Sequence, residues 1–245
     1  MKKLWIFGDS YGCPNYKWVG GYKWPVELAN VYDITNEAKA GVGTEYCLNK
    51  LDTQIKNTPN SELGEISLLF IIPNTNRFNF SFWHDPADQV MPNSILNQYH
   101  DPAFKKNIDT AMAKKLSQYK KFDKFILNFF KYYAFENSNN LFWLTLGKLK
   151  ILSPKFKKVL IWPTQEIPRK FDLDLVQDTR LTIFKMQMEI LSKRTYEFPR
   201  GSFYDPRANH VSEEDHIHIY NLLSRWMEDE NITNDTLLDI WPDLK

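Results

Sequence analysis

A serine near the start of the chain and a histidine near its end could together cleave an ester bond. Ser10 follows a short apolar run in the segment Gly8-Asp9-Ser10, and His210 lies just before a stretch typical of a helix with an acidic first turn. A serine hydroxyl is almost wholly protonated at neutral pH, so it needs a base such as imidazole to act as a nucleophile. Taken alone, the tripeptide is more often a turn, and His210 could equally pack over a helix N-terminus.

Two further segments carry groups that could stabilise a developing oxyanion. Residues 36–43 (NEAKAGVG) contain glycines, which allow a backbone N–H to approach a ligand closely. Residues 73–77 (PNTNR) follow an apolar run, and an asparagine there could donate its side-chain amide. In isolation, a glycine turn and an Asx turn explain the same residues.

The elements that must position these segments follow from the hydrophobic pattern. Short apolar runs predict strands, and three- or four-residue apolar spacing predicts helices. The predicted strands are 4–8, 31–35, 66–72 and 157–162; the predicted helices are 24–31, 44–56, 141–152, 173–194 and 212–227, with one or two more in 104–135. Strands separated by helices favour a parallel sheet with helices on both faces. Ligands of such sheets bind at the carboxyl ends of strands, where the turns after 4–8 and 66–72 would lie.

Length and composition predict one domain over residues 1–245, with a helical insertion or lid at about 84–152. A chain of 245 residues, 43% of them hydrophobic, can bury a sizeable core. Its net charge of +1 creates no overall attraction to nucleic acid or to an anionic membrane. The longest apolar stretch, 68–73, is far shorter than the roughly 20 residues of a membrane-spanning helix, and the N-terminus does not resemble a signal peptide. Cys13 and Cys47 fit a reducing cytosol, so we expect a cytoplasmic protein without membrane insertion.

Other chemistries are less well supported by the sequence. It contains no P-loop, G-x-G-x-x-G or C-x-x-C motif, which argues against nucleotide binding and structural zinc. The pairs His84-Asp85 and His100-Asp101 are adjacent, and adjacent side chains rarely converge on one metal. The lysines within 105–124 favour a solvated helix face over a nucleic-acid stripe. We therefore expect no metal, no organic cofactor and no nucleic-acid partner, and the oligomeric state stays open.

The order and spacing of the four segments resemble the SGNH (GDSL-type) hydrolase family, from Trp5 to about Leu223. The features shared are Gly-Asp-Ser after the first strand, Asn-x-Ala-x-x-Gly, an asparagine after a hydrophobic strand, and a late histidine. Residues 210–216 (HVSEEDH) resemble the family's His-x-Ser-x-x-Gly-His ending, with Asp215 in place of glycine. Arg77-Phe78 resembles a subgroup found among bacteriophage proteins. The resemblance implies a three-layer α/β/α, flavodoxin-like fold with a helical insertion.

The same resemblance implies a role for each matching residue. Ser10 would be the nucleophile, and His210 the general base and then the general acid for the leaving alcohol. The oxyanion hole would be formed by the backbone N–H groups of Ser10 and Gly41 and the side-chain amide of Asn74. The residues expected to bind substrate are Asp9, Asn76 and Arg77.

Two positions depart from the family pattern. The third block usually reads Gly-x-Asn-Asp, but residues 72–75 read IPNT, so Asn76 rivals Asn74 as the oxyanion donor. The family's aspartate, three residues before the histidine, is replaced by Arg207. Asp205 is the nearest carboxylate, and either Asp205 or a backbone carbonyl would orient the His210 ring.

These observations predict a serine ester hydrolase. Its substrate would be a carbohydrate O-acetyl group, a short-chain carboxylic ester or a lipid. The alternative is a degenerate scaffold of the same fold that binds a sugar or a protein partner without turnover, because Arg207 replaces the usual carboxylate. If the chain is phage-encoded, its location would be the host cytoplasm or the virion. His216 and His218 lie within the last predicted helix, and we expect them to be structural.

Overall fold

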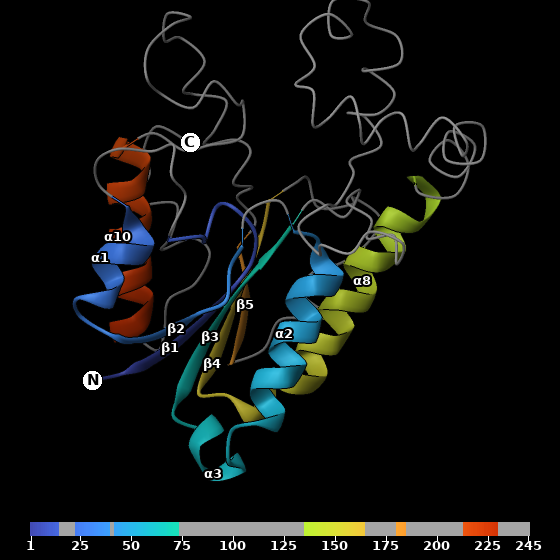
Figure 1. The fold of residues 1–245 in the computed structure, drawn as a ribbon, viewed down its shortest axis with the longest axis horizontal. Helices are drawn as coiled ribbons and strands as arrows, with labels where there is room; N and C mark the ends of the chain where they lie inside the picture. Colours follow the sequence, from blue (N-terminus) through green and yellow to red (C-terminus); the bar gives the residue numbers. More distant parts are fainter. Residues whose placement is uncertain (15–22, 40–41, 74–134, 165–179, 185–212, 230–245) are drawn as a thin grey trace, which may run out of the picture.

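Five parallel strands form the centre of the molecule, in the order β2-β1-β3-β4-β5 (Figure 1). The computed structural model describes residues 1–14, 23–39, 42–73, 135–164, 180–184 and 213–229. The strands are β1 (Lys3–Phe7), β2 (Asp33–Asn36), β3 (Ile66–Ile72), β4 (Lys158–Pro163) and β5 (Leu181–Ile183). This strand order is that of flavodoxin-like sheets, so the predicted parallel α/β fold is confirmed.

Helices cover both faces of the sheet and complete three layers (Figure 1). One face carries α1 (Trp24–Ala29) and α10 (Glu213–Glu228), and the other carries α2 (Thr44–Lys56) and α8 (Phe135–Leu152). Two short elements, α3 (Asn60–Leu63) and η2 (Ser153–Lys155), precede β3 and β4. Within the described ranges, no helix has the length and apolar character needed to cross a membrane.

The core is divided into two halves by the alternation of side chains along each strand. In β3, Leu69 and Ile71 pack toward α1 and α10, whereas Leu68, Phe70 and Ile72 pack toward α2 and α8. All seven residues of β3 are buried, because helices cover both of its faces. This double burial explains why the strand reads as an uninterrupted apolar run in the sequence.

The predicted helix at 173–194 is wrong at residues 181–183, which form β5. Leu181 and Ile183 pair with Val159 and Ile161 of β4, and both are fully buried against the α8 face. The acidic start and basic end of this segment match a helix dipole, but burial of alternate residues at the sheet edge decides the outcome. The remainder of the predicted helix lies outside the described residues.

The predicted insertion at about 84–152 is described only in its last part. That part is α8, which places Phe142, Leu146 and Leu149 in the core beneath the sheet. The helix begins earlier than the predicted 141–152. Residues 74–134, including the predicted helical stretch 104–135, lie outside the described ranges, so a lid remains a prediction there.

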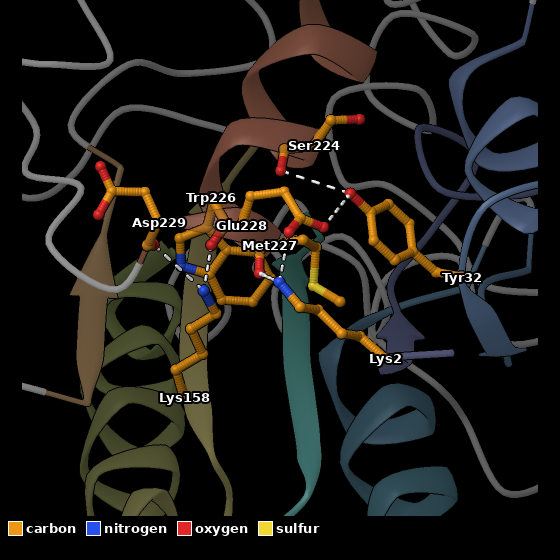
Figure 2. Close-up of polar contacts among 8 residues, drawn as sticks. All are labelled: Lys2, Tyr32, Lys158, Ser224, Trp226, Met227, Glu228 and Asp229. Carbon is orange, nitrogen blue, oxygen red and sulfur yellow. Dashed lines mark hydrogen bonds and ion pairs between the residues drawn. The ribbon is translucent and has the colours of Figure 1, made fainter.

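Two lysines from the amino ends of the strands hold the last turn of α10 (Figure 2). The Lys158 ammonium donates hydrogen bonds to the carbonyls of Trp226 and Asp229 and lies 4.9 Å from the centre of the Trp226 ring. The Lys2 ammonium donates to the Met227 carbonyl at 3.2 Å and pairs with Glu228. The last carbonyls of a helix lack intrahelical partners and carry partial negative charge, so cations stabilise them.

A tyrosine from the other side extends this contact. The Tyr32 hydroxyl donates to the Glu228 carboxylate at 3.2 Å and to the Ser224 carbonyl at 3.4 Å (Figure 2). Burial and the bond to Glu228 raise the pKa of Tyr32, whereas the hydrogen bond from Lys2 lowers the pKa of Glu228. Both shifts favour the neutral phenol and the ionised carboxylate that the contact requires.

The contacts of Lys2, Lys158 and Tyr32 with the end of α10, here called the clamp, also fix the direction of the helix. Its last turn lies at the amino ends of β1 and β4, so the helix runs antiparallel to the strands. Its 16 residues are about 24 Å long, and the seven residues of β3 extend about 23 Å. The first turn of α10 therefore lies toward the carboxyl edge of the sheet.

We predict that Lys158→Met destabilises the protein, because it leaves buried helix-end carbonyls without their charged donor. The expected loss in free energy of unfolding is about 1.5–3 kcal/mol, as for other hydrogen bonds to charged groups. Urea denaturation measures it, with Lys155→Met in the exposed part of η2 as the matched control. Equal stability of the two variants would contradict the clamp.

Candidate active site

The topology of the sheet marks a ligand position between β1 and β3. The chain leaves β1, forms β2 on one side of it, and then returns to form β3 on the other side. The intervening helices α1 and α2 lie on opposite faces (Figure 1). Open α/β sheets bind ligands at such switch points, at the carboxyl ends of the strands. Ser10 follows β1, and the predicted Asn74 comes two residues after the last residue of β3.

A tight turn holds Ser10 directly after β1. The Gly12 N–H donates to the Asp9 carbonyl and the Tyr11 N–H donates to the Asp9 carboxylate, both at 3.2 Å. Ser10 occupies the second position of this turn, and neither of these bonds uses its N–H. The Tyr11 ring is 7% exposed and packs into the core on the α1 and α10 face, which anchors the turn.

Gly8 allows the turn to pack directly on β3. A Cβ on Gly8 would lie 2.7 Å from the Cβ of Ile71, closer than real side chains approach. A Cβ on Gly12 would lie 2.9 Å from the Ile71 Cδ1 and 3.0 Å from the Ala38 Cβ. The glycine of the Gly-Asp-Ser motif is thus required by this close approach.

The segment after β2 runs beside the same turn. Its backbone N–H groups at Glu37 and Lys39 donate to the carbonyls of Ile6 and Gly8, at 2.9 and 3.0 Å. The Asn36 side chain donates to the Gly12 carbonyl at 2.9 Å. The loops that follow β1 and β2 are therefore joined by both backbone and side-chain hydrogen bonds.

The end of β3 is held in a similar way from the other side. The N–H and the hydroxyl of Thr164, just past β4, both donate to the Ile72 carbonyl at 3.0 Å. Thr164 is 1% exposed, so this contact is shielded from water. It fixes the point from which the predicted segment 73–77 departs.

Of the predicted site residues, the described ranges contain only Asp9 and Ser10. Asp9 is 1% exposed and Ser10 is 9% exposed. The bond from Tyr11 gives the Asp9 carboxylate a role in holding the turn, and its contact with substrate stays a prediction. The predicted residues outside the described ranges are Gly41, Asn74, Asn76, Arg77, Asp205 and His210.

The first turn of α10 carries two buried titratable side chains. Asp215 is 4% exposed and His216 is 8% exposed, whereas His218 is partly buried. The structural role expected for His216 stays a prediction. Among the side chains that the structure describes, no three His, Cys, Asp or Glu groups are arranged to hold a metal ion.

Two residues with long-range contacts had no role assigned from the sequence. Asn36 is the asparagine of the Asn-x-Ala-x-x-Gly segment, and its place in that motif, at the end of a strand, was the available signal. Lys158 is the second residue of the predicted strand 157–162, and its sequence gives no sign that it reaches the end of a distant helix. Both contacts depend on tertiary structure that local sequence does not specify.

No protein-family model matches the chain, and no curated protein has a matching sequence. The resemblance to SGNH hydrolases therefore rests on the four sequence segments and stays a prediction. What the structure contributes independently is the fold and the position of Ser10 at the switch point.

We predict that Gly8→Ala strains the Ser10 turn, because its new methyl group would overlap Ile71. The expected loss in free energy of unfolding is about 1–3 kcal/mol, as in other overpacked cores. Gly64→Ala is the matched control, since a Cβ there meets no atom within 4 Å and its φ of −63° suits alanine. The control should be neutral or gain about 0.4–1 kcal/mol in urea denaturation. If both variants unfold at the same urea concentration, the close approach is not a constraint.

Proposed function

We propose that the chain is a serine ester hydrolase with Ser10 as its nucleophile and His210 as its base. The observation that carries this proposal is the position of Ser10, in a hydrogen-bonded turn directly after β1 and beside the switch point of the sheet. In this position a serine can meet a ligand bound at the carboxyl edge, while its backbone N–H is not used by the turn.

The proposed reaction is an acyl transfer in two steps. The Ser10 oxygen bonds to the acyl carbon as its proton passes to His210, and the negative charge develops on the former carbonyl oxygen. His210 then gives that proton to the leaving alcohol. Water attacks the acyl-enzyme in the second step, with its proton again passing through His210, and the carboxylic acid is released.

The three residues proposed to act with Ser10 are close in sequence to elements that the structure describes. His210 precedes the first residue of α10 by three positions, and that end of α10 lies toward the carboxyl edge. Gly41 directly precedes Val42, and Asn74 directly follows Pro73, the residue after β3. All three proposed partners thus lie within three residues, along the sequence, of a described segment. Asn76 remains the rival of Asn74.

The orientation of the base has two candidate solutions. Asp205 or a backbone carbonyl would accept a hydrogen bond from the other ring N–H of His210 and so hold the productive tautomer. Arg207, at the position where the family has its aspartate, cannot accept that hydrogen bond. This substitution favours the second candidate function, a scaffold that binds a sugar or a protein partner without turnover.

The substrate class follows from the proposed chemistry rather than from a bound ligand. We propose a carbohydrate O-acetyl group or a short-chain carboxylic ester, with Asp9, Asn76 and Arg77 as candidate contacts. The mechanism uses protein groups throughout and calls for no metal or organic cofactor. Cys13 and Cys47 are both free thiols, which fits the proposed cytoplasmic location.

We predict that Ser10→Ala abolishes both hydrolysis of p-nitrophenyl acetate and covalent labelling by a fluorophosphonate. Loss of a serine nucleophile typically lowers turnover by about three orders of magnitude or more. Ser61→Ala, in the exposed part of α3, is the control and should keep wild-type rates. A folded wild-type protein that neither reacts nor turns over would favour the binding scaffold. A Ser10→Ala enzyme with wild-type turnover would remove Ser10 from the mechanism.

We predict that His210→Ala is as damaging to turnover as Ser10→Ala, and that the double variant is hardly slower than either. Residues that act as one catalytic unit lose their effects together rather than additively. His216→Ala serves as the comparison, and it should lower the unfolding temperature more than the turnover because His216 is buried in α10. A stable but inactive His216→Ala enzyme would show that the base is His216 and that its assignment to His210 is wrong.

A further inference from the structure

The structure brings two backbone segments to one side chain at the end of β2, that of Asn36. We infer that Asn36 is a positioning residue that couples the Ser10 turn to the segment leading to Gly41. The coupling itself rests on the geometry of the described residues, and its consequence for turnover rests on the proposed function.

The Asn36 amide uses both of its ends. Its Nδ2 group donates to the Gly12 carbonyl at 2.9 Å, and its Oδ1 atom accepts the Ala38 N–H at 2.9 Å. Asn36 is the last residue of β2 and lies in register with Ile6 of β1. One side chain thereby joins the end of the Ser10 turn to the backbone that leaves β2.

Backbone pairing makes this contact part of a continuous connection. The N–H groups of Glu37 and Lys39 donate to Ile6 and Gly8, so the segment 37–39 follows β1 beyond the end of β2. The bond from Lys39 holds the near side of the turn, at Gly8. The Asn36 side chain holds its far side, at Gly12.

Close packing leaves little freedom between the joined segments. The position of a Cβ on Gly12 is only 3.0 Å from the Ala38 Cβ, so the two loops touch at this point. The Asn36 side chain is itself partly buried. A shift of the segment after β2 would therefore be transmitted to the turn that carries Ser10.

The chemistry of the site gives this coupling a purpose. Under the proposed function, the N–H groups of Ser10 and Gly41 receive the same oxyanion, although they come from different loops. Preorganised donors lose effect steeply when displaced, and an error of 1 Å can lower turnover about 100-fold. Ser10 lies two residues before Gly12, and Gly41 lies five residues after Asn36. Asn36 thus joins the two loops that would supply these donors.

The side-chain requirement is specific. The contact needs one donor and one acceptor on a short side chain, which asparagine provides. Asn36→Asp keeps the acceptor toward Ala38 but directs a second acceptor at the Gly12 carbonyl. Asn36→Leu removes both bonds at similar volume. Protonation of the new aspartate at low pH would restore a donor, so Asn36→Asp has an internal control.

Amide hydrogen exchange measures the coupling without relying on catalysis. At neutral pH, after correction for intrinsic rates, we expect the Gly12 and Ala38 amides to exchange at least 10-fold faster in Asn36→Leu. In Asn36→Asp we expect this of the Gly12 amide alone, because the acceptor toward Ala38 is kept. In Asn36→Asp, the protection of Gly12 should recover below about pH 4, where the carboxyl group is protonated. Asn49→Asp, at an exposed position of α2, makes the same chemical change and should alter neither amide.

Kinetics with p-nitrophenyl acetate then separate positioning from general stability. We expect both variants to lower kcat about 100-fold with KM changed less than twofold, because donors that act on the transition state are displaced. A variant that is merely less stable would lose active protein in proportion to its unfolded fraction, which urea denaturation measures independently.

Each outcome decides a different part of the inference. Unchanged protection of Gly12 and Ala38 would overturn the coupling. Lost protection with unchanged kcat would overturn the role in catalysis. If the wild-type protein has no turnover, the proposed function and the catalytic role fall, while hydrogen exchange still decides whether Asn36 couples the loops. If Asn36→Leu does not fold, the pH dependence of Asn36→Asp provides the same decision.

Discussion

The pairing of β1 with a parallel neighbour on each side is the constraint on which the rest of the structure depends. Because β2 and β3 both bond to β1, the chain must leave β1 between two neighbouring strands at the carboxyl edge. The emerging turn has no space to expand, since Ile71 of β3 lies beneath Gly8 and Gly12. Packing against the sheet therefore sets the shape of the turn, and the turn determines where Ser10 lies.

The opposite edge of the sheet contributes by holding α10. Lys158 and Lys2 fix the end of the helix with charged hydrogen bonds, and apolar residues such as Leu222 and Trp226 fix its side against the core. Because a helix is stiff, fixing its end and its side also fixes the place of its first turn. The two edges thus cooperate: one shapes the turn of Ser10, and the other sets the direction of the helix that His210 precedes.

The fold was predictable where a residue pattern is compatible with only one kind of secondary structure. β3 and β4 are buried on both faces, so their apolar runs left few alternatives. β5 was not predicted. Its three residues give too short a strand pattern, and the charges at the two ends of 173–194 favoured a helix. The contacts of Asn36 and Lys158 could not be predicted, because they join residues that only the tertiary structure brings together. The motif at Gly8 was recognisable, whereas its contact with Ile71 needed the structure.

The two candidate functions make different demands on this carboxyl edge. A scaffold that only binds a sugar or a protein can adjust its contacts through side-chain rotamers while its backbone moves little. A catalyst must hold donors from separate loops at one point in the transition state, and it gains nothing from donors that are free to move. The turn after β1 is fixed by Ile71 below, by two bonds to Asp9 within, and by Asn36 beside it. Contacts of this kind meet the demand for preorganised donors and support the proposed enzyme, whereas Arg207 supports the binding scaffold.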